Sequence, residues 1–189
     1  MPVEEAEDIY YQFLDAVGQI YENTNIKAIR SASSLPENFD TTNPDNIIST
    51  DDSTTPIYAW YDNTDDAGII YVYSDDTIKA NKNMGYSLMG LSALTDISSL
   101  ADWDMSGTES VFFFFGTGTY GYSSLTDISA LANWDTSNVT NMSSMFYYAS
   151  KITDLSPLNN WTVNPSARMS GMFTKIPSSV ARPTWYVGN

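Results

Sequence analysis

The chain has 189 residues, of which 42% are hydrophobic, so it can build one domain with a sizeable core. Its formal net charge of −15, from 8 basic and 23 acidic residues, argues against nucleic acid or an anionic membrane surface as a partner. The absence of Cys and His excludes disulfides, thiolate chemistry, the usual general base near neutral pH and the commonest transition-metal ligand.

Residues 1–30 are predicted to form a helix. Acidic side chains fall in its first turns, where they suit the helix dipole, and Ile9, Phe13, Val17 and Ile20 are spaced for one apolar face. The simpler interpretation is a helix that packs against the rest of the domain, and the alternative is a linker helix to an upstream anchor. The first residues do not resemble a signal peptide, so we expect one to have been removed, with Met1 as an added start.

Residues 31–56 are predicted to form a loop or linker, because they are polar and contain three prolines. Residues 57–76 are predicted to form a capping β-hairpin. Its strands are the β-branched and aromatic segments 57–61 and 69–73. The acidic connection 62–68 is a weak match to a calcium-binding loop, since it lacks the regular ligand spacing, and a solvated turn is favoured.

Residues 77–175 contain a tandem repeat, with units near 77–93, 94–124, 125–151 and 152–175. The segment LTDIS at 94–98 returns at 125–129 and, as ITDLS, at 152–156, which are offsets of 31 and 27 residues. A period in this range predicts a solenoid. Residues 176–189 depart from the pattern and are predicted to form a C-terminal cap.

Each unit is predicted to combine a short strand with a tight helical turn, so that the fold class is an α/β solenoid with an N-terminal helix and a capping β-hairpin. Ser129 and Ser156 are the predicted caps of these turns. No apolar run is long enough to cross a membrane, so we expect no membrane insertion. The predicted repeat core consists of Leu94, Ile97, Leu100, Trp103, Leu125, Ile128, Leu131, Trp134, Val139, Met142, Phe146, Ile152, Leu155, Leu158, Trp161, Met169 and Phe173.

Stacking of such units would bring Asp96, Asp127 and Asp154 into one column of like charges. The simpler interpretation is that each carboxylate accepts backbone N–H bonds from the turn that follows it. The alternative is that the column binds a cation or a basic partner.

The unit that begins at residue 94 is four residues longer than the next, and the extra length falls near the aromatic and Gly-rich segment 111–122. Insertions of this kind often mark a binding face. The four consecutive Phe residues 112–115 are predicted to be mostly core. Tyr120 and Tyr122 are predicted to be exposed, where they could stack on a sugar or a peptide.

Residues 124–128 (SLTDI) and 134–146 (WDTSNVTNMSSMF) resemble the BspA-type leucine-rich repeat of bacterial surface proteins. The hairpin segments 58–63 and 70–73 also resemble the region that precedes such repeats. The corresponding runs after Trp103 and Trp161 depart from the motif. The resemblance implies a leucine-rich-repeat-like, right-handed stack of short parallel strands and short helical returns. It also implies export, surface display and binding of a ligand, without catalytic residues.

The predicted function is therefore an exported, non-enzymatic module that binds a protein or a glycan at the cell surface, as a monomer and without a cofactor or metal. One alternative is a structural spacer that holds another domain away from the cell wall. A more distant alternative is a glycan hydrolase that uses two carboxylates, the remaining catalytic route for this composition, although no acid pair stands out in the sequence.

Overall fold

The computed structural model describes residues 25–49, 55–62, 64–118 and 121–188. Three strands, β1 (Ala28–Ser31), β2 (Tyr58–Asp62) and β3 (Ile69–Tyr73), form one sheet of order β1-β3-β2. Strand β3 lies antiparallel to β2 and parallel to β1. Five short 3-10 helices lie wholly within the described residues: η2 (Pro44–Asn46), η3 (Thr64–Asp66), η4 (Ser98–Asp102), η6 (Ser129–Leu131) and η7 (Ser156–Asn160).

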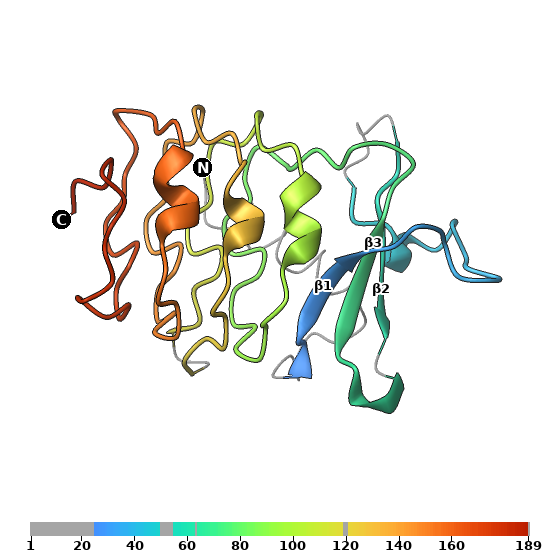
Figure 1. The fold of residues 1–189 in the computed structure, drawn as a ribbon. Coiled ribbons are helices and arrows are strands. Elements are labelled where there is room, and N and C mark those ends of the chain that lie inside the picture. Colours follow the sequence, from blue (N-terminus) through green and yellow to red (C-terminus); the bar gives the residue numbers. More distant parts are fainter. Residues whose placement is uncertain (1–24, 50–54, 63, 119–120, 189) are drawn as a thin grey trace.

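The prediction of an α/β solenoid is wrong. In the described part of the chain no α-helix is present, and the helical returns are 3-10 helices and turns. The described residues of the repeat units form no strands. The units are joined by isolated parallel bridges, including those that link Asn83 to Ser110, Ser110 to Asn141, and Asn141 to Arg168. Figure 1 shows η4, η6 and η7 side by side, with the sheet at one end of this stack and the C-terminal residues at the other.

The predicted N-terminal helix is also wrong where it can be compared. Residues 1–24 lie outside the described residues, and 28–31 form strand β1. This segment is extended because its backbone is paired on both sides. On one side it pairs with β3, and on the other the N–H of Ile29 donates to the carbonyl of Asp96 at 2.8 Å. The predicted hairpin segments do form β2 and β3, but as part of a sheet that β1 connects to the first repeat.

A ladder of backbone hydrogen bonds runs through the stack instead of strands. At each joint, every second N–H group of one unit donates to every second carbonyl group of the next unit. A peptide group whose carbonyl accepts at one joint then donates through its N–H at the following joint. The first joint consists of the bonds from Met84 to Ser110, Tyr86 to Phe112, Leu88 to Phe114 and Gly90 to Gly116, at 2.8 to 3.2 Å. Because these peptide groups satisfy one another between units, the segments need no regular strand.

Left-handed residues make this ladder possible. Tyr86, Phe113, Ser144 and Gly171 each follow a bridge residue by three positions and have φ between 56° and 67°. Intervening residues close tight turns, such as the bond from the Phe114 N–H to the Val111 carbonyl. Because left-handed residues alternate with tight turns, the linking peptide groups keep pointing along the stack. The segments that the sequence predicted as strands are therefore consecutive turns.

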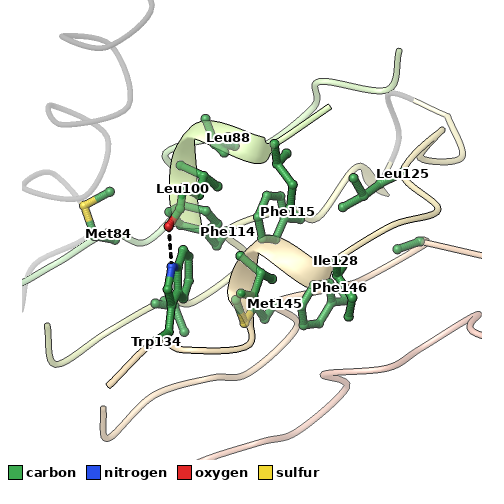
Figure 2. Packing of buried hydrophobic residues seen from close by; sticks show 14 of the residues in the cluster. Met84, Leu88, Leu100, Phe114, Phe115, Leu125, Ile128, Trp134, Met145 and Phe146 are labelled. Atoms are coloured by element: carbon green, nitrogen blue, oxygen red, sulfur yellow. Dashed lines mark hydrogen bonds between the residues drawn. The ribbon is translucent and has the colours of Figure 1, made fainter. Parts of the chain in front are cut away.

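The residues predicted to form the repeat core are all buried, and with the inner face of the sheet they form one cluster. Hydrogen bonds from indoles also link the units. The Nε1–H of Trp134 donates to the Leu100 carbonyl at 2.7 Å, as Figure 2 shows. Trp161 repeats this bond to Leu131, and Trp185 to Leu158. The C-terminal segment, which departs from the repeat in sequence, therefore still supplies the last indole of this series.

Candidate binding surface

Six aromatic side chains form a continuous strip across three joined units, which we call the aromatic strip. Tyr122 is 58% exposed and the others are half-buried. Each ring lies within 6.0 Å of the next, measured between centroids. The strip consists of Tyr86, Phe112, Phe113, Tyr122, Tyr147 and Tyr148. At its far end the Lys175 ammonium lies over the Tyr148 ring, 5.6 Å from the centroid.

Three of these aromatics occupy left-handed backbone positions, with φ of 65° at Tyr86, 56° at Phe113 and 68° at Tyr148. Bulky side chains at positive φ are uncommon and cost on the order of 1–3 kcal/mol each. Gly171 holds the position equivalent to Tyr86 and Phe113 in the last unit, so the ladder itself requires no ring there. The aromatic side chains at these positions therefore add a conformational free-energy cost that a glycine would avoid.

The four consecutive Phe residues divide into two pairs. Phe114 and Phe115 are buried, whereas Phe112 and Phe113 are half-buried and belong to the strip. In a strand the side chains would alternate, but the left-handed Phe113 places neighbouring residues on the same side. The ring of Phe113 packs directly on Gly116, where a Cβ atom would overlap it.

The structure gives each of the three candidate Asp residues a local role. Asp96, Asp127 and Asp154 each accept a hydrogen bond through Oδ1 from the backbone N–H two residues later, at 2.8 to 3.0 Å. Ser129 and Ser156, which were predicted to cap these turns, therefore donate through their backbone N–H groups, and the preceding Asp side chain is the acceptor. The 3-10 helices that begin after these Asp residues have no side-chain cap of their own.

Asp96 has a second partner, because Arg30 Nε donates to its Oδ2 at 2.9 Å. Burial has the largest influence on this carboxyl and raises its pKa, but hydrogen bonds from Ser98 and Arg30 outweigh it and keep the pKa below the usual range. Across the described residues, no cluster of three or more acidic side chains could hold a metal ion. All three Asp side chains are thus engaged by their own turns, and Asp96 also by the ion pair to β1.

Of the two predicted aromatic contacts, Tyr122 joins the strip through a ring contact with Tyr148 at 5.3 Å, and Tyr120 lies outside the described residues. Sequence reasoning missed Tyr86, Tyr147 and Tyr148. A signal was present, since Tyr147 and Tyr148 follow the repeated Met-x-x-Met-Phe run directly. Their exposure depends on the turn conformation, which a strand-based interpretation does not contain.

A family comparison matches the stacked region. The family model described as "Mycoplasma protein of unknown function, DUF285" covers residues 82–182, which is more than half of the chain. The chain belongs to this family. The DUF285 region begins next to the bridge residue Asn83 and ends in the segment that carries the last indole, so it includes the whole aromatic strip and leaves out the three-stranded sheet.

No curated protein and no solved structure matches the chain significantly. Within the described ranges, none of the helices is both long and apolar enough for a membrane crossing.

Proposed function

We propose that this DUF285 member is an exported, non-enzymatic module of the cell surface that binds a protein or glycan ligand along the aromatic strip. The observation that carries the proposal is the combination of exposure and backbone strain in the strip. Three of its rings lie at positive φ, where glycine would be favoured, and the rings remain in contact across three units.

Aromatic rings suit this role because they offer a large contact area with few rotatable bonds. The four tyrosines of the strip add hydroxyl groups for hydrogen bonds to a polar ligand. Export and surface display are supported by the resemblance of residues 124–128 and 134–146 to the BspA-type repeat.

Binding is tested by applying the chain to an array of glycans and of extracellular matrix proteins, followed by calorimetry on any hit. The informative variants are Tyr122→Ala and Tyr148→Ser, which remove contacting rings of the strip. Each should weaken binding about tenfold, which corresponds to the roughly 1.4 kcal/mol expected for one well-placed ring.

The matched control is Tyr73→Ala, because Tyr73 is a half-buried tyrosine at the end of β3 that contacts Asp75, away from the strip. Its affinity should equal that of the unmodified chain. Equal losses for all three variants, or no ligand on either array, would favour the structural spacer and contradict the proposal.

A further inference from the structure

The backbone ladder is open at the last unit of the stack. At the preceding joint, four N–H groups donate to carbonyls of the last unit at 2.8 to 3.0 Å, and they belong to Met142, Ser144, Phe146 and Tyr148. The equivalent N–H groups, 27 residues later, belong to Met169, Gly171, Phe173 and Lys175. None of these four groups has an acceptor in the described part of the chain. A row of unpaired N–H groups of this kind is a template for pairing with another chain.

The C-terminal segment covers the rings of this end and leaves the row of N–H groups unpaired. Trp185 stacks on Trp161 with ring centroids 5.9 Å apart, and Tyr186 meets Phe173 edge-on at 4.8 Å. The Arg182 guanidinium donates only to carbonyls of its own segment and the residue before it. This end of the stack is the one farthest from the sheet, as Figure 1 shows.

Two of the four donors belong to residues that solvent reaches. Lys175 is exposed and Gly171 is half-buried, whereas the other two residues are buried. A Cβ atom at Gly171 would meet only the hydroxyl groups of Ser144 and Thr174 within 4 Å, so the C-terminal segment does not close over that side of the glycine. Gly171 and Lys175 therefore carry the two N–H groups that a partner can approach.

This end is also positively charged, in a chain with a formal net charge of −15. Residues 155–189 contain no acidic residue, and their basic residues are Arg168, Lys175 and Arg182. Nearer the N-terminus, three basic side chains form salt bridges to carboxylates at 2.9 to 3.0 Å. Arg168 and Lys175 are exposed and form no salt bridge with any described residue. These two cations stand at the two ends of the open row, because Arg168 directly precedes its first donor and Lys175 is its last.

Unpaired N–H groups between two unpaired cations define the chemistry of a partner. Peptide carbonyls fill the equivalent positions at every earlier joint, and the cations favour carboxylates. A long polyanion such as nucleic acid would be repelled by the acidic remainder of the chain, whereas a short acidic segment would not reach it.

We propose that the C-terminal end of the stack binds an acidic peptide segment of a partner protein. Carbonyls of the peptide accept from the N–H groups of Gly171 and Lys175, and its carboxylates pair with the side chains of Arg168 and Lys175. The end borders the aromatic strip at Lys175 but uses other groups, so the proposal does not depend on the function proposed above.

The probe is a capped octapeptide of alternating aspartate and serine, which are residue types that adopt turns readily. Titration of the ¹⁵N-labelled full chain to about 5 mM peptide at low salt should shift the amide signals of Gly171 and Lys175 and leave that of Met84, in the first joint, in place. Hydrogen exchange at Gly171 and Lys175 should slow about threefold or more, because a new hydrogen bond protects them. The same peptide with asparagine in place of aspartate should bind about tenfold more weakly.

The double variant Arg168→Gln, Lys175→Gln removes both cations and should weaken binding of the acidic peptide about tenfold. The matched control is Lys79→Gln, Lys82→Gln, which makes the same change in net charge at exposed lysines of the first unit and should leave the affinity within about twofold. Tyr122→Ala, from the strip, should also leave it unchanged. If strip variants lose their own ligand while Gly171 still responds to the peptide, this inference stands by itself.

Four results would overturn the proposal. The amide signals of Gly171 and Lys175 could stay in place throughout the titration, or the two peptides could bind equally. Sodium sulfate could shift the same signals as far as the acidic peptide does at equal concentration, which would identify a site for small anions. A Gly171 signal that moves with protein concentration, together with self-association in analytical ultracentrifugation, would assign the end to a second copy of this chain.

Discussion

Two features of individual residues are unusual. Tyr86, Phe113 and Tyr148 have aromatic rings at positive φ, and the buried indole N–H of Trp103 has no acceptor among the described residues. Both are local departures from the arrangement that the repeat adopts elsewhere. Gly171 shows the left-handed position without a ring, and Trp134 shows the indole with its carbonyl. Such departures are where a function is most reasonably sought, because the fold does not require them.

A substitution at Gly116 tests whether close packing of the Phe113 ring on this glycine holds the ring in the strip. A Cβ atom at this position would overlap the ring of Phe113, so Gly116→Ala should displace that half-buried ring. We expect a stability loss of about 1 kcal/mol, measured by urea unfolding, together with weaker ligand binding. Gly107→Ala is the matched control, since a Cβ atom there has no neighbour within 4 Å, and it should change neither quantity. Equal behaviour of the two variants would contradict this account.

The turn carboxylates predict the response to acid. Hydrogen bonds from Ser106 and Ser137 lower the pKa of Asp104 and Asp135, and those from Ser156 lower the pKa of Asp154. A lowered folded-state pKa stabilises the fold above the unfolded value near 4. That contribution is lost as pH falls through the folded value. The melting temperature should therefore fall from about pH 4 downwards.

The matched variant for this effect is the double substitution Asp104→Asn, Asp135→Asn, which removes two of these titrations. The loss of melting temperature between pH 5 and pH 3, measured by circular dichroism, should be smaller than in the unmodified chain. An identical loss in both proteins would assign acid unfolding to other groups.

At the scale of elements, the units depend on each other more than on their own regular structure. The 3-10 helices span only three to five residues, and the joints consist of backbone ladder bonds and stacked side chains. Phe115, Phe146 and Phe173 stack in sequence, as do Trp134, Trp161 and Trp185. A unit without a neighbour would leave both its ladder and its ring faces exposed.

Trp185 therefore acts as the last contact of the stack. It lies 5.9 Å from Trp161, with nearly parallel rings, and its Nε1–H donates to Leu158 at 2.7 Å. Trp185→Ala should destabilise the chain by about 2–3 kcal/mol, less than a fully buried Trp because the residue is half-buried. Hydrogen exchange should accelerate most at Met142 and Phe146, the ladder donors of the last joint.

Trp185→Phe preserves an aromatic ring and removes only the hydrogen bond, so its effect should be intermediate. Exchange at Met84, a donor of the first joint, should change least in both variants. Uniform acceleration along the whole ladder would show that the stack opens only as one unit and would contradict local fraying.

At the scale of the whole molecule, the sheet and the stack share one hydrophobic core. The cluster extends from Ile29, in β1, to Ile176 and Val180, near the C-terminus. The connection is reinforced where β1 bridges to Asp96. Although the family match covers only the stack, the sheet is therefore an integral part of the folded unit.

A shared core predicts one cooperative unfolding transition. Urea curves recorded by indole fluorescence, which reports mainly on the stack, and by circular dichroism should coincide. Two separated midpoints would show that the sheet and the stack unfold independently.

The sequence by itself determined which residues recur and which are buried, because the spacing of Leu, Met and Trp between units reflects their shared packing and survives any change in backbone detail. It also located β2 and β3, whose β-branched and aromatic residues are strong local signals. Only the tertiary structure decided that the units are turns joined by a ladder, that residues 28–31 are a strand, and that six aromatics meet on one surface. These features arise from hydrogen bonds and ring contacts between segments far apart in the chain and from left-handed residues such as Phe113, for which residue type alone gives no signal.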